Sequence, residues 1–360
     1  MEMTSRERVR LALEHEQADR VAIHDSPWGT TVARWRREGL PEGVSPQDFF
    51  GYELAGFGPD ISLRLPTEVL EETDEWIIQR RSEGAIHRNW KGRTSTPELI
   101  DFTIKTRADW EEHKPRLAYD ESRLNLEHAG NAHAGAREKG LFLTFGGGVG
   151  YDHNSASLLG PVGLLTAIVE EPDWVADIFM TQADLAVRIA EELFERGIDF
   201  DAAFYYDDLG YRNGLFFSPR AYRELLQPAH RRYLEPFKRR GLPCILHSCG
   251  CVKEAIPDLL DAGWTCLQPL EVKAGMDVVE LKRKYGDVMA FMGGIDVRKM
   301  ALDDLGPIEE EIRTKIGFAK QGGGYVYYSD HSVPDDVSFA NYQRVIELVH
   351  RYGRYDSETP

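Results

Sequence analysis

The chain has 360 residues, of which 42% are hydrophobic, and this is enough to bury a large core. Its formal net charge of −17 repels nucleic acid, and no basic stripe with interleaved aromatic residues offsets that charge. No run of about 18 apolar residues occurs, which argues against a membrane-spanning helix. The charged start MEMTSRERVRLALEHEQADR lacks the apolar segment of a signal peptide, so we expect a cytoplasmic protein.

From the amino terminus, this charged and amphipathic start predicts a short helical extension. Short apolar segments follow, and amphipathic helical stretches separate those after residue 200. Such alternation is typical of a parallel sheet, and eight units favour a closed barrel over an open sheet. We predict an α/β fold, a single (β/α)8 TIM barrel that spans residues 1–360. The predicted strands are 20–25, 57–63, 140–147, 200–208, 243–250, 264–271, 287–294 and 323–330.

The region of about 70–110 departs from this alternation. In the stretch DEWIIQRRSEGAIHRNWKGRT, apolar and polar side chains alternate on both sides of Glu83 and Gly84. Alternation with a period of two around a turn predicts a β-hairpin. We place this inserted β-hairpin after the second strand, where it would cover the barrel mouth.

Active sites of (β/α)8 barrels lie at the carboxyl ends of the strands. Polar and titratable residues gather at these ends, whereas turns on the opposite face, such as RRGLP, carry no comparable group. This one-sided distribution predicts an active site at the barrel mouth. The strand-end residues are His24, Asp25, Trp28, Asp152, His153, Tyr205, Tyr206, Asp207, Asp208, His247, Cys249, Glu271, Lys273, Asp296, Ser329, Asp330 and His331.

The stretch CILHSCGCV holds three of the four cysteines together with a histidine. His247 and Cys249 are two residues apart, so on an extended chain their side chains share a face. Imidazole nitrogen and thiolate are zinc ligands, and a catalytic zinc ion takes three protein ligands and keeps one position open. Glu271 at the next strand end is a candidate third ligand, and Asp330 or His331 is a further candidate.

Other interpretations of this cluster stay open. Cys244 and Cys266 lie inside predicted strands and are expected to be small core residues, while Cys251 is expected to turn into the following helix. Lys273 is near enough in sequence to pair with Glu271, and such an ion pair would argue against metal ligation by that glutamate.

Three segments cover about residues 200–350 in order: YYDDLGYRNGLFFSPRAYRELLQPAHRRYLEPFKRRGLPCILHSCGCV, LQPLEVKAGMDVVELKRKYGDVMAFMGGIDVRKM and GGGYVYYSDHSVPDDVSFANYQRVIELV. Together they resemble the uroporphyrinogen decarboxylase superfamily, which includes the decarboxylase and the zinc-dependent, corrinoid-linked methyltransferases. The resemblance implies a (β/α)8 barrel, in agreement with the strand count. The earlier part of the chain resembles the superfamily only loosely.

The decarboxylase carries an arginine-rich start of the type R-Q-A-G-R-Y, which holds the carboxylates of its substrate. Here HDSPWGTTVARW stands in that place, although His331 matches a histidine after the last strand. An acidic protein also attracts a polycarboxylate poorly. The resemblance therefore favours the methyltransferases over the decarboxylase.

The methyltransferases carry H-x-C after strand five, a glutamate after strand six and a cysteine near strand eight as zinc ligands. His247, Cys249 and Glu271 match the first three positions, whereas YSDHSV replaces the last and offers Asp330 or His331. A site with one thiolate makes the metal a stronger Lewis acid. Two substrate types therefore stay open: a thiol, or a compound whose methyl group is bonded to oxygen, such as a methoxy ether.

The sequence thus predicts a metal-dependent methyltransferase or demethylase that moves a methyl group between a small methylated substrate or thiol and a corrinoid protein. The alternatives are a metal-independent decarboxylase or lyase, and a non-catalytic binder of a tetrapyrrole or of a corrinoid protein. Zinc is the predicted cofactor, a corrinoid enters only through a partner protein, and a homodimer stays open. The predicted residues are Asp207, Asp208 and His331 for catalysis, Trp28, Tyr205, His153 and Lys273 for substrate binding, and His247, Cys249, Glu271 and Asp330 for the metal.

Overall fold

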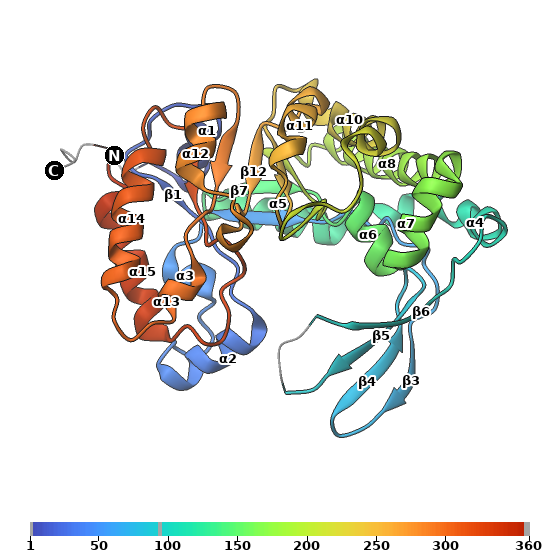
Figure 1. Ribbon diagram of the computed structural model, residues 1–360, viewed down its shortest axis with the longest axis horizontal. Coiled ribbons are helices and arrows are strands. Elements are labelled where there is room, and N and C mark those ends of the chain that lie inside the picture. The colour runs from blue at the N-terminus through green and yellow to red at the C-terminus, as the bar shows by residue number, and fades with distance from the viewer. Residues whose placement is uncertain (1–2, 93–95, 356–360) are drawn as a thin grey trace.

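A computed structural model describes residues 3–92 and 96–355, and its eight main strands form one curled sheet (Figure 1). The strand order is β1-β14-β13-β12-β11-β8-β7-β2. Every ladder between neighbours in this sheet is parallel, so the carboxyl ends of the strands lie on one rim. The strands are β1 (Ala22–Ile23), β2 (Leu54–Phe57), β7 (Phe142–Phe145), β8 (Ala202–Tyr206), β11 (Cys244–His247), β12 (Cys266–Gln268), β13 (Ala290–Met292) and β14 (Tyr325–Tyr327).

Side chains at alternate strand positions form an apolar cluster inside the curled sheet. Helix α1 (Ser5–Leu13) closes the amino ends of the strands, because its Val9, Ala12 and Leu13 belong to the same cluster. The predicted amino-terminal helix is therefore present, at the end of the sheet opposite the rim. The strand residues of the cluster, with Tyr328 directly after β14, are Ala22, Leu54, Phe142, Ala202, Phe204, Ile245, Cys266, Ala290, Met292, Val326 and Tyr328.

Helices cover the outer face of the sheet and bury a larger apolar cluster against it (Figure 1). In α15 (Phe339–Tyr352), Ser338 caps the first turn, and the buried residues Tyr342, Ile346 and Val349 recur at helical spacing on one face. None of the described helices has the length and apolar character needed to cross a membrane. The other α-helices are α2 (Gly29–Glu38), α3 (Pro46–Phe50), α4 (Arg107–His113), α5 (Leu126–Glu138), α6 (Gly150–Ser157), α7 (Pro161–Glu170), α8 (Pro172–Glu195), α9 (Pro219–Ala221), α10 (Gln227–Lys238), α11 (Ile256–Ala262), α12 (Val278–Tyr285), α13 (Val297–Met300) and α14 (Gly306–Ala319).

The two end strands of the sheet, β1 and β2, meet without a ladder between their described residues. One backbone hydrogen bond joins them, in which the N–H of Glu53 donates to the carbonyl of Ile23 at 2.9 Å. The buried carboxylate of Glu53 reinforces this junction, since it accepts the N–H of Ile23 at 2.5 Å and pairs with Arg8 and Arg20. The sheet is curled, and its full closure into a (β/α)8 barrel stays a prediction.

The second strand lies earlier in the chain than its sequence predicts. It is β2, at Leu54–Phe57, and not 57–63. Pro59 lacks the N–H that a ladder requires, so the strand ends before it. The residues after it form a loop at the rim instead.

The inserted region folds as a four-stranded antiparallel sheet, so the prediction of a single hairpin is too small (Figure 1). The predicted hairpin is its central pair, in which Trp76 lies opposite Trp90 and Arg80 lies opposite Ile86. Residues 93–95 of this region lie outside the described chain. The strands are β3 (Glu68–Glu72), β4 (Trp76–Arg80), β5 (Ala85–Trp90) and β6 (Glu98–Phe102), and a separate small hairpin after β8 is formed by β9 (Gly210–Tyr211) and β10 (Gly214–Leu215).

Asp25, just after β1, links the first strand to the last strand and to α15. Its buried carboxylate accepts hydrogen bonds from the hydroxyls of Ser329 at 2.5 Å and of Tyr342 at 2.7 Å. Burial raises the pKa of Asp25 to about 6, although these hydrogen bonds oppose the rise. The folded protein therefore binds the proton of Asp25 more tightly than the unfolded chain does.

This raised pKa predicts a pH-dependent contribution to stability. The contribution of Asp25 to the free energy of unfolding is complete below pH about 4 and is lost as the pH rises through about 6, by up to about 3 kcal/mol. Asp25→Asn removes a titrating group, so the stability advantage of the wild type over this variant should shrink across that range. Urea unfolding at several pH values between about 4 and 7 measures the difference. A difference that does not change with pH would contradict the raised pKa.

Candidate functional site

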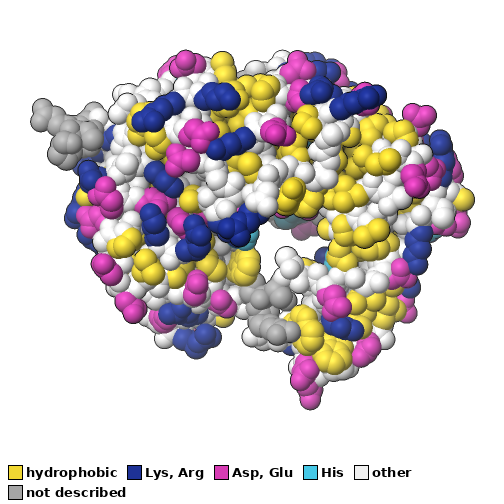
Figure 2. All heavy atoms as spheres, in the orientation of Figure 1, with side chains coloured by type: hydrophobic (Ala, Val, Ile, Leu, Met, Phe, Trp, Pro, Cys, Tyr) yellow, Lys and Arg dark blue, Asp and Glu magenta, His cyan; other side chains and the backbone are white. Residues whose placement is uncertain are grey.

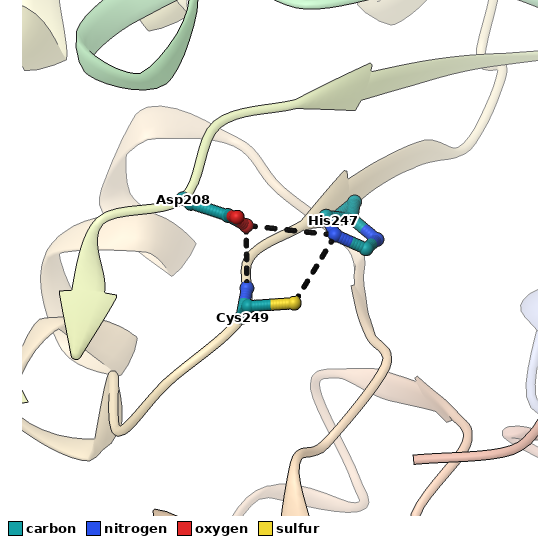
Figure 3. Close-up of side chains that lie close together, drawn as sticks. All are labelled: Asp208, His247 and Cys249. Carbon is teal, nitrogen blue, oxygen red and sulfur yellow. Dashed lines mark hydrogen bonds and ion pairs between the residues drawn. The ribbon is translucent and has the colours of Figure 1, made fainter. Parts of the chain in front are cut away.

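Asp208, His247 and Cys249 come together on the rim, where β8 and β11 end (Figure 3). One ligand atom of each residue lies within 4.8 Å of the other two. Nε2 of His247 is 3.5 Å from Sγ of Cys249 and 3.5 Å from Oδ1 of Asp208. These three residues form a group that could share one metal ion.

Strand geometry places these three side chains. His247 continues the inward-facing series of β11 that includes Ile245, and Cys249 follows two residues later. Parallel pairing sets His247 opposite Tyr206 of β8, so Asp208 stands just beyond the neighbouring strand end. The carboxylate of Asp208 accepts the backbone N–H of Cys249 at 2.7 Å, which fixes the two strand ends to each other.

Gln268, the last residue of β12, orients the imidazole of His247. Its side-chain oxygen contacts Nδ1 of the ring, and because this oxygen only accepts, Nδ1 carries the proton. Nε2 then presents its lone pair toward Cys249 and Asp208. Burial lowers the pKa of His247, so the ring is neutral near neutral pH. A neutral imidazole held by an outer hydrogen bond is the form in which histidine binds metals.

Cys249 lies in buried and acidic surroundings. Burial first, and then the charges of Asp208 and Glu271, raise the pKa of its thiol well above the usual range. A cation among these groups would reverse the effect, because it stabilises the thiolate and the carboxylate together. One imidazole nitrogen, one sulfur and one carboxylate oxygen are ligands that zinc accepts, so the residues present fit a zinc ion.

Glu271, a predicted metal ligand, makes other contacts. Its carboxylate accepts the backbone N–H of Gly250 at 2.6 Å and pairs with Nζ of Lys273 at 3.1 Å. The sequence left open an ion pair between Lys273 and Glu271, which would argue against metal ligation by Glu271, and the structure contains this pair. Glu271 and Lys273 therefore border the cluster and hold the loop that follows Cys249.

Asp330, the other predicted carboxylate ligand, is buried between loops. Its two oxygens accept the backbone N–H groups of Val272 and Val297, both at 3.0 Å. Both oxygens are thus engaged in joining the loops after β12 and β13. Among the described residues the cluster contains Asp208 and neither Glu271 nor Asp330, whose predicted metal ligation stays a prediction.

Asp207 faces the helices, and not the mouth. Its fully buried carboxylate lies 2.9 Å from Nε2 of His230 on α10 and accepts the backbone N–H of Asp152 at 2.8 Å. Successive strand residues point to opposite faces of a sheet, so Asp208 reaches the site while Asp207 does not. Asp207 thus positions α6, and its predicted catalytic role stays a prediction.

Asp152, in the first turn of α6, is a candidate functional residue to which the sequence assigned no role. Burial, and then the charges of Asp208 and Asp207, raise its pKa to about 7. A carboxyl group that titrates near neutrality can hold or release a proton beside the cluster. Its only sequence signal is its position after the glycine-rich end of the third strand.

The aromatic residues differ in their access to the site. Tyr206 faces it, with its ring 4.9 Å from that of His247 and 40% of its surface exposed. Tyr205 is fully buried and packs against Tyr233 of the helix layer, and its predicted role in substrate binding stays a prediction. Trp28 and His331 pack edge to face at 5.8 Å on the β1 and β14 side of the rim, where a role in substrate binding or catalysis stays a prediction.

These features define an α/β protein with a curled parallel sheet and, at the strand ends, a group of side chains that could hold a metal ion. A family model described as uroporphyrinogen decarboxylase (URO-D) matches residues 154–352, more than half of the chain. The chain therefore belongs to the URO-D family, and the resemblance seen in its sequence is confirmed. The match includes Asp208, His247 and Cys249, whereas Asp152 and the inserted sheet lie before it.

A solved structure shares the fold. A methyltransferase from Methanosarcina mazei aligns over 98% of this chain and 99% of its own, with a TM-score of 0.67 and 16% identity. At that identity the likeness concerns the fold. A psychrophilic glycoside hydrolase family 10 endo-β-1,4-xylanase aligns over 62% of this chain and 81% of its own, but its TM-score of 0.36 and 10% identity carry no argument. No protein of curated function matches the sequence.

Gly150 should be essential for the position of α6. Its φ of 58° is left-handed, and a Cβ atom there would lie 2.1 Å from Oδ2 of Asp207. We expect Gly150→Ala to destabilise the protein by about 2–5 kcal/mol, from backbone strain together with this overlap. Gly147→Ala is the matched control, because a Cβ atom there meets no heavy atom within 4 Å. Equal losses in urea unfolding of the two variants would contradict this account.

Proposed function

We propose that this chain is a metal-dependent methyltransferase, which moves a methyl group between a small methylated compound or thiol and a corrinoid protein. The proposal rests on one observation: ligand atoms of Asp208, His247 and Cys249 lie within 4.8 Å of one another. Membership of the URO-D family and a fold shared with a methyltransferase support it.

The three residues would hold a zinc ion through Oδ1 of Asp208, Nε2 of His247 and Sγ of Cys249, leaving one position for substrate. When bound, zinc would supply Lewis acidity to the sulfur or oxygen atom at which the methyl group is transferred. A single thiolate donates less charge than two do, which keeps this acidity high. Such a site suits an oxygen-linked methyl group as well as a thiol.

The surrounding residues would manage the proton and the substrate. Asp152 would take up the proton of an acceptor thiol, or return one to an oxygen that loses its methyl group. Tyr206 would pack against the methyl-bearing group beside His247, and Trp28 and His331 would close the other side of the mouth. We include in the proposal the closed (β/α)8 barrel, which the hydrogen bond between Glu53 and Ile23 supports.

The corrinoid would come with a separate protein, as the resemblance to the corrinoid-linked methyltransferases implies. The given sequence contains no segment of the D-x-H-x-x-G type. The rim, where the cluster lies, is the surface that such a protein would have to reach.

Metal content tests this proposal. We expect wild-type protein to hold about one zinc ion per chain, and we expect Asp208→Ala, His247→Ala and Cys249→Ala each to lose more than about 100-fold in zinc affinity. Cys251→Ala is the matched control, since this neighbouring cysteine is not part of the cluster. Elemental analysis and competition with a chelator measure both quantities.

Loss of methyl transfer to a corrinoid protein should accompany loss of zinc in the three cluster variants and should not occur in Cys251→Ala. Wild-type protein that binds no zinc after refolding with excess metal would contradict the proposal. So would a methyl-transfer rate that a chelator leaves unchanged, because that result would point to the metal-independent alternative.

A further inference from the structure

A polar cavity of about 270 Å³ lies between the rim and the base of the inserted sheet. Its wall is formed by the loop after β2, the glycine-rich loop after β7 and the turn between β4 and β5, together with His153 of α6 and Tyr205 of β8. Glu83 comes from that turn and His153 from α6, so the inserted sheet and the main sheet each contribute a polar side chain. Figure 2 shows the molecular surface hollowed beside the inserted sheet.

The two carboxylates in the cavity wall differ in how their charge is balanced. Asp60 pairs with Arg64 at 2.6 Å and lies 3.6 Å from Arg123, so its charge is compensated. Glu83 forms no ion pair and no side-chain hydrogen bond with any residue that the structure describes. The cavity therefore contains one negative charge without a cationic partner.

His153 does not supply that partner. Burial lowers the pKa of His153, and the charge of Glu83 opposes the shift without cancelling it. The imidazole is thus neutral near neutral pH and offers one N–H and one lone pair. A ligand in this cavity meets an uncompensated carboxylate together with a neutral hydrogen-bonding group.

The cavity lies one strand end away from the metal cluster. The carbonyl of Gly147 accepts the N–H of Tyr206 at 2.9 Å, and Gly148 forms a parallel bridge with the same tyrosine. The ring of Tyr206 in turn lies 4.9 Å from that of His247. The cavity wall thus adjoins Tyr206 through the backbone, and a substrate that spans both places would pass Tyr206 on its way from His247 to Glu83.

We propose that this cavity binds the part of the substrate that does not carry the transferred methyl group, and that this part bears a protonated amine. The inference rests on the proposed methyl transfer at the cluster. Glu83 supplies the opposite charge and His153 accepts an N–H, whereas a carboxylate in the same place would be repelled by Glu83. A volume of about 270 Å³ equals about nine water molecules, which limits the bound part to a small group.

Three probes of nearly equal size separate charge from shape: benzylamine, benzyl alcohol and benzoate. Titration calorimetry on zinc-loaded and on metal-free protein gives their affinities. We expect benzylamine to bind at least about tenfold more tightly than benzoate in both forms, since Glu83 does not depend on the metal. Glu83→Gln should remove this preference, and Glu83→Lys should reverse it.

Glu75→Gln is the matched control, because Glu75 is an exposed glutamate of the same inserted sheet outside the cavity wall. It should leave the three affinities unchanged. Equal binding of benzylamine and benzoate, no binding of any probe, or an amine preference that survives Glu83→Lys would overturn the proposal. An amine preference in metal-free protein supports the cavity even where methyl transfer fails, so the two proposals are tested separately.

Discussion

The parallel, in-register pairing of β8, β11 and β12 is the constraint on which the site depends. It sets His247 beside Tyr206 on one side and beside Gln268 on the other, so three strands converge on one imidazole. The hydrogen bond from the N–H of Cys249 to Asp208 then fixes the strand ends at the distance that the cluster requires. A shift of one residue in any of these strands would turn its end residues to the opposite face of the sheet.

Together with burial, acidic groups on this rim determine the protonation of the Cys249 thiol, and they favour a bound cation. The charges of Asp208, Glu271 and Asp152 all raise the pKa of the Cys249 thiol. Of the charged groups that act on this pKa, Lys273 is the one that lowers it. Such an arrangement is costly without a cation and favourable with one, because the same charges that oppose ionisation of the thiol stabilise a bound metal. Behind the sheet, Asp207 holds the first turn of α6 and so keeps Asp152 in this group.

The strand order and the convergence of His247 with Cys249 could be predicted, since both follow from repeating apolar segments and from a period of two. The sequence could not predict which of Asp207 and Asp208 faces the site. This depends on where the regular strand ends and to which face the next side chain points. The structural contacts of Asp330 could not be predicted either, because its backbone partners lie on two loops distant in sequence. The size of the inserted sheet was missed because its outer strands, EVLEE and ELIDF, are short and acidic.

X-ray absorption at the zinc edge of the zinc-loaded protein tests the central claim most directly, since it counts the sulfur ligands. The account predicts one sulfur at about 2.3 Å together with nitrogen and oxygen ligands at about 2.0–2.2 Å, and a spectrum unchanged in Cys251→Ala. Two or more sulfur ligands, or a zinc shell without sulfur, would contradict a site built from Asp208, His247 and Cys249.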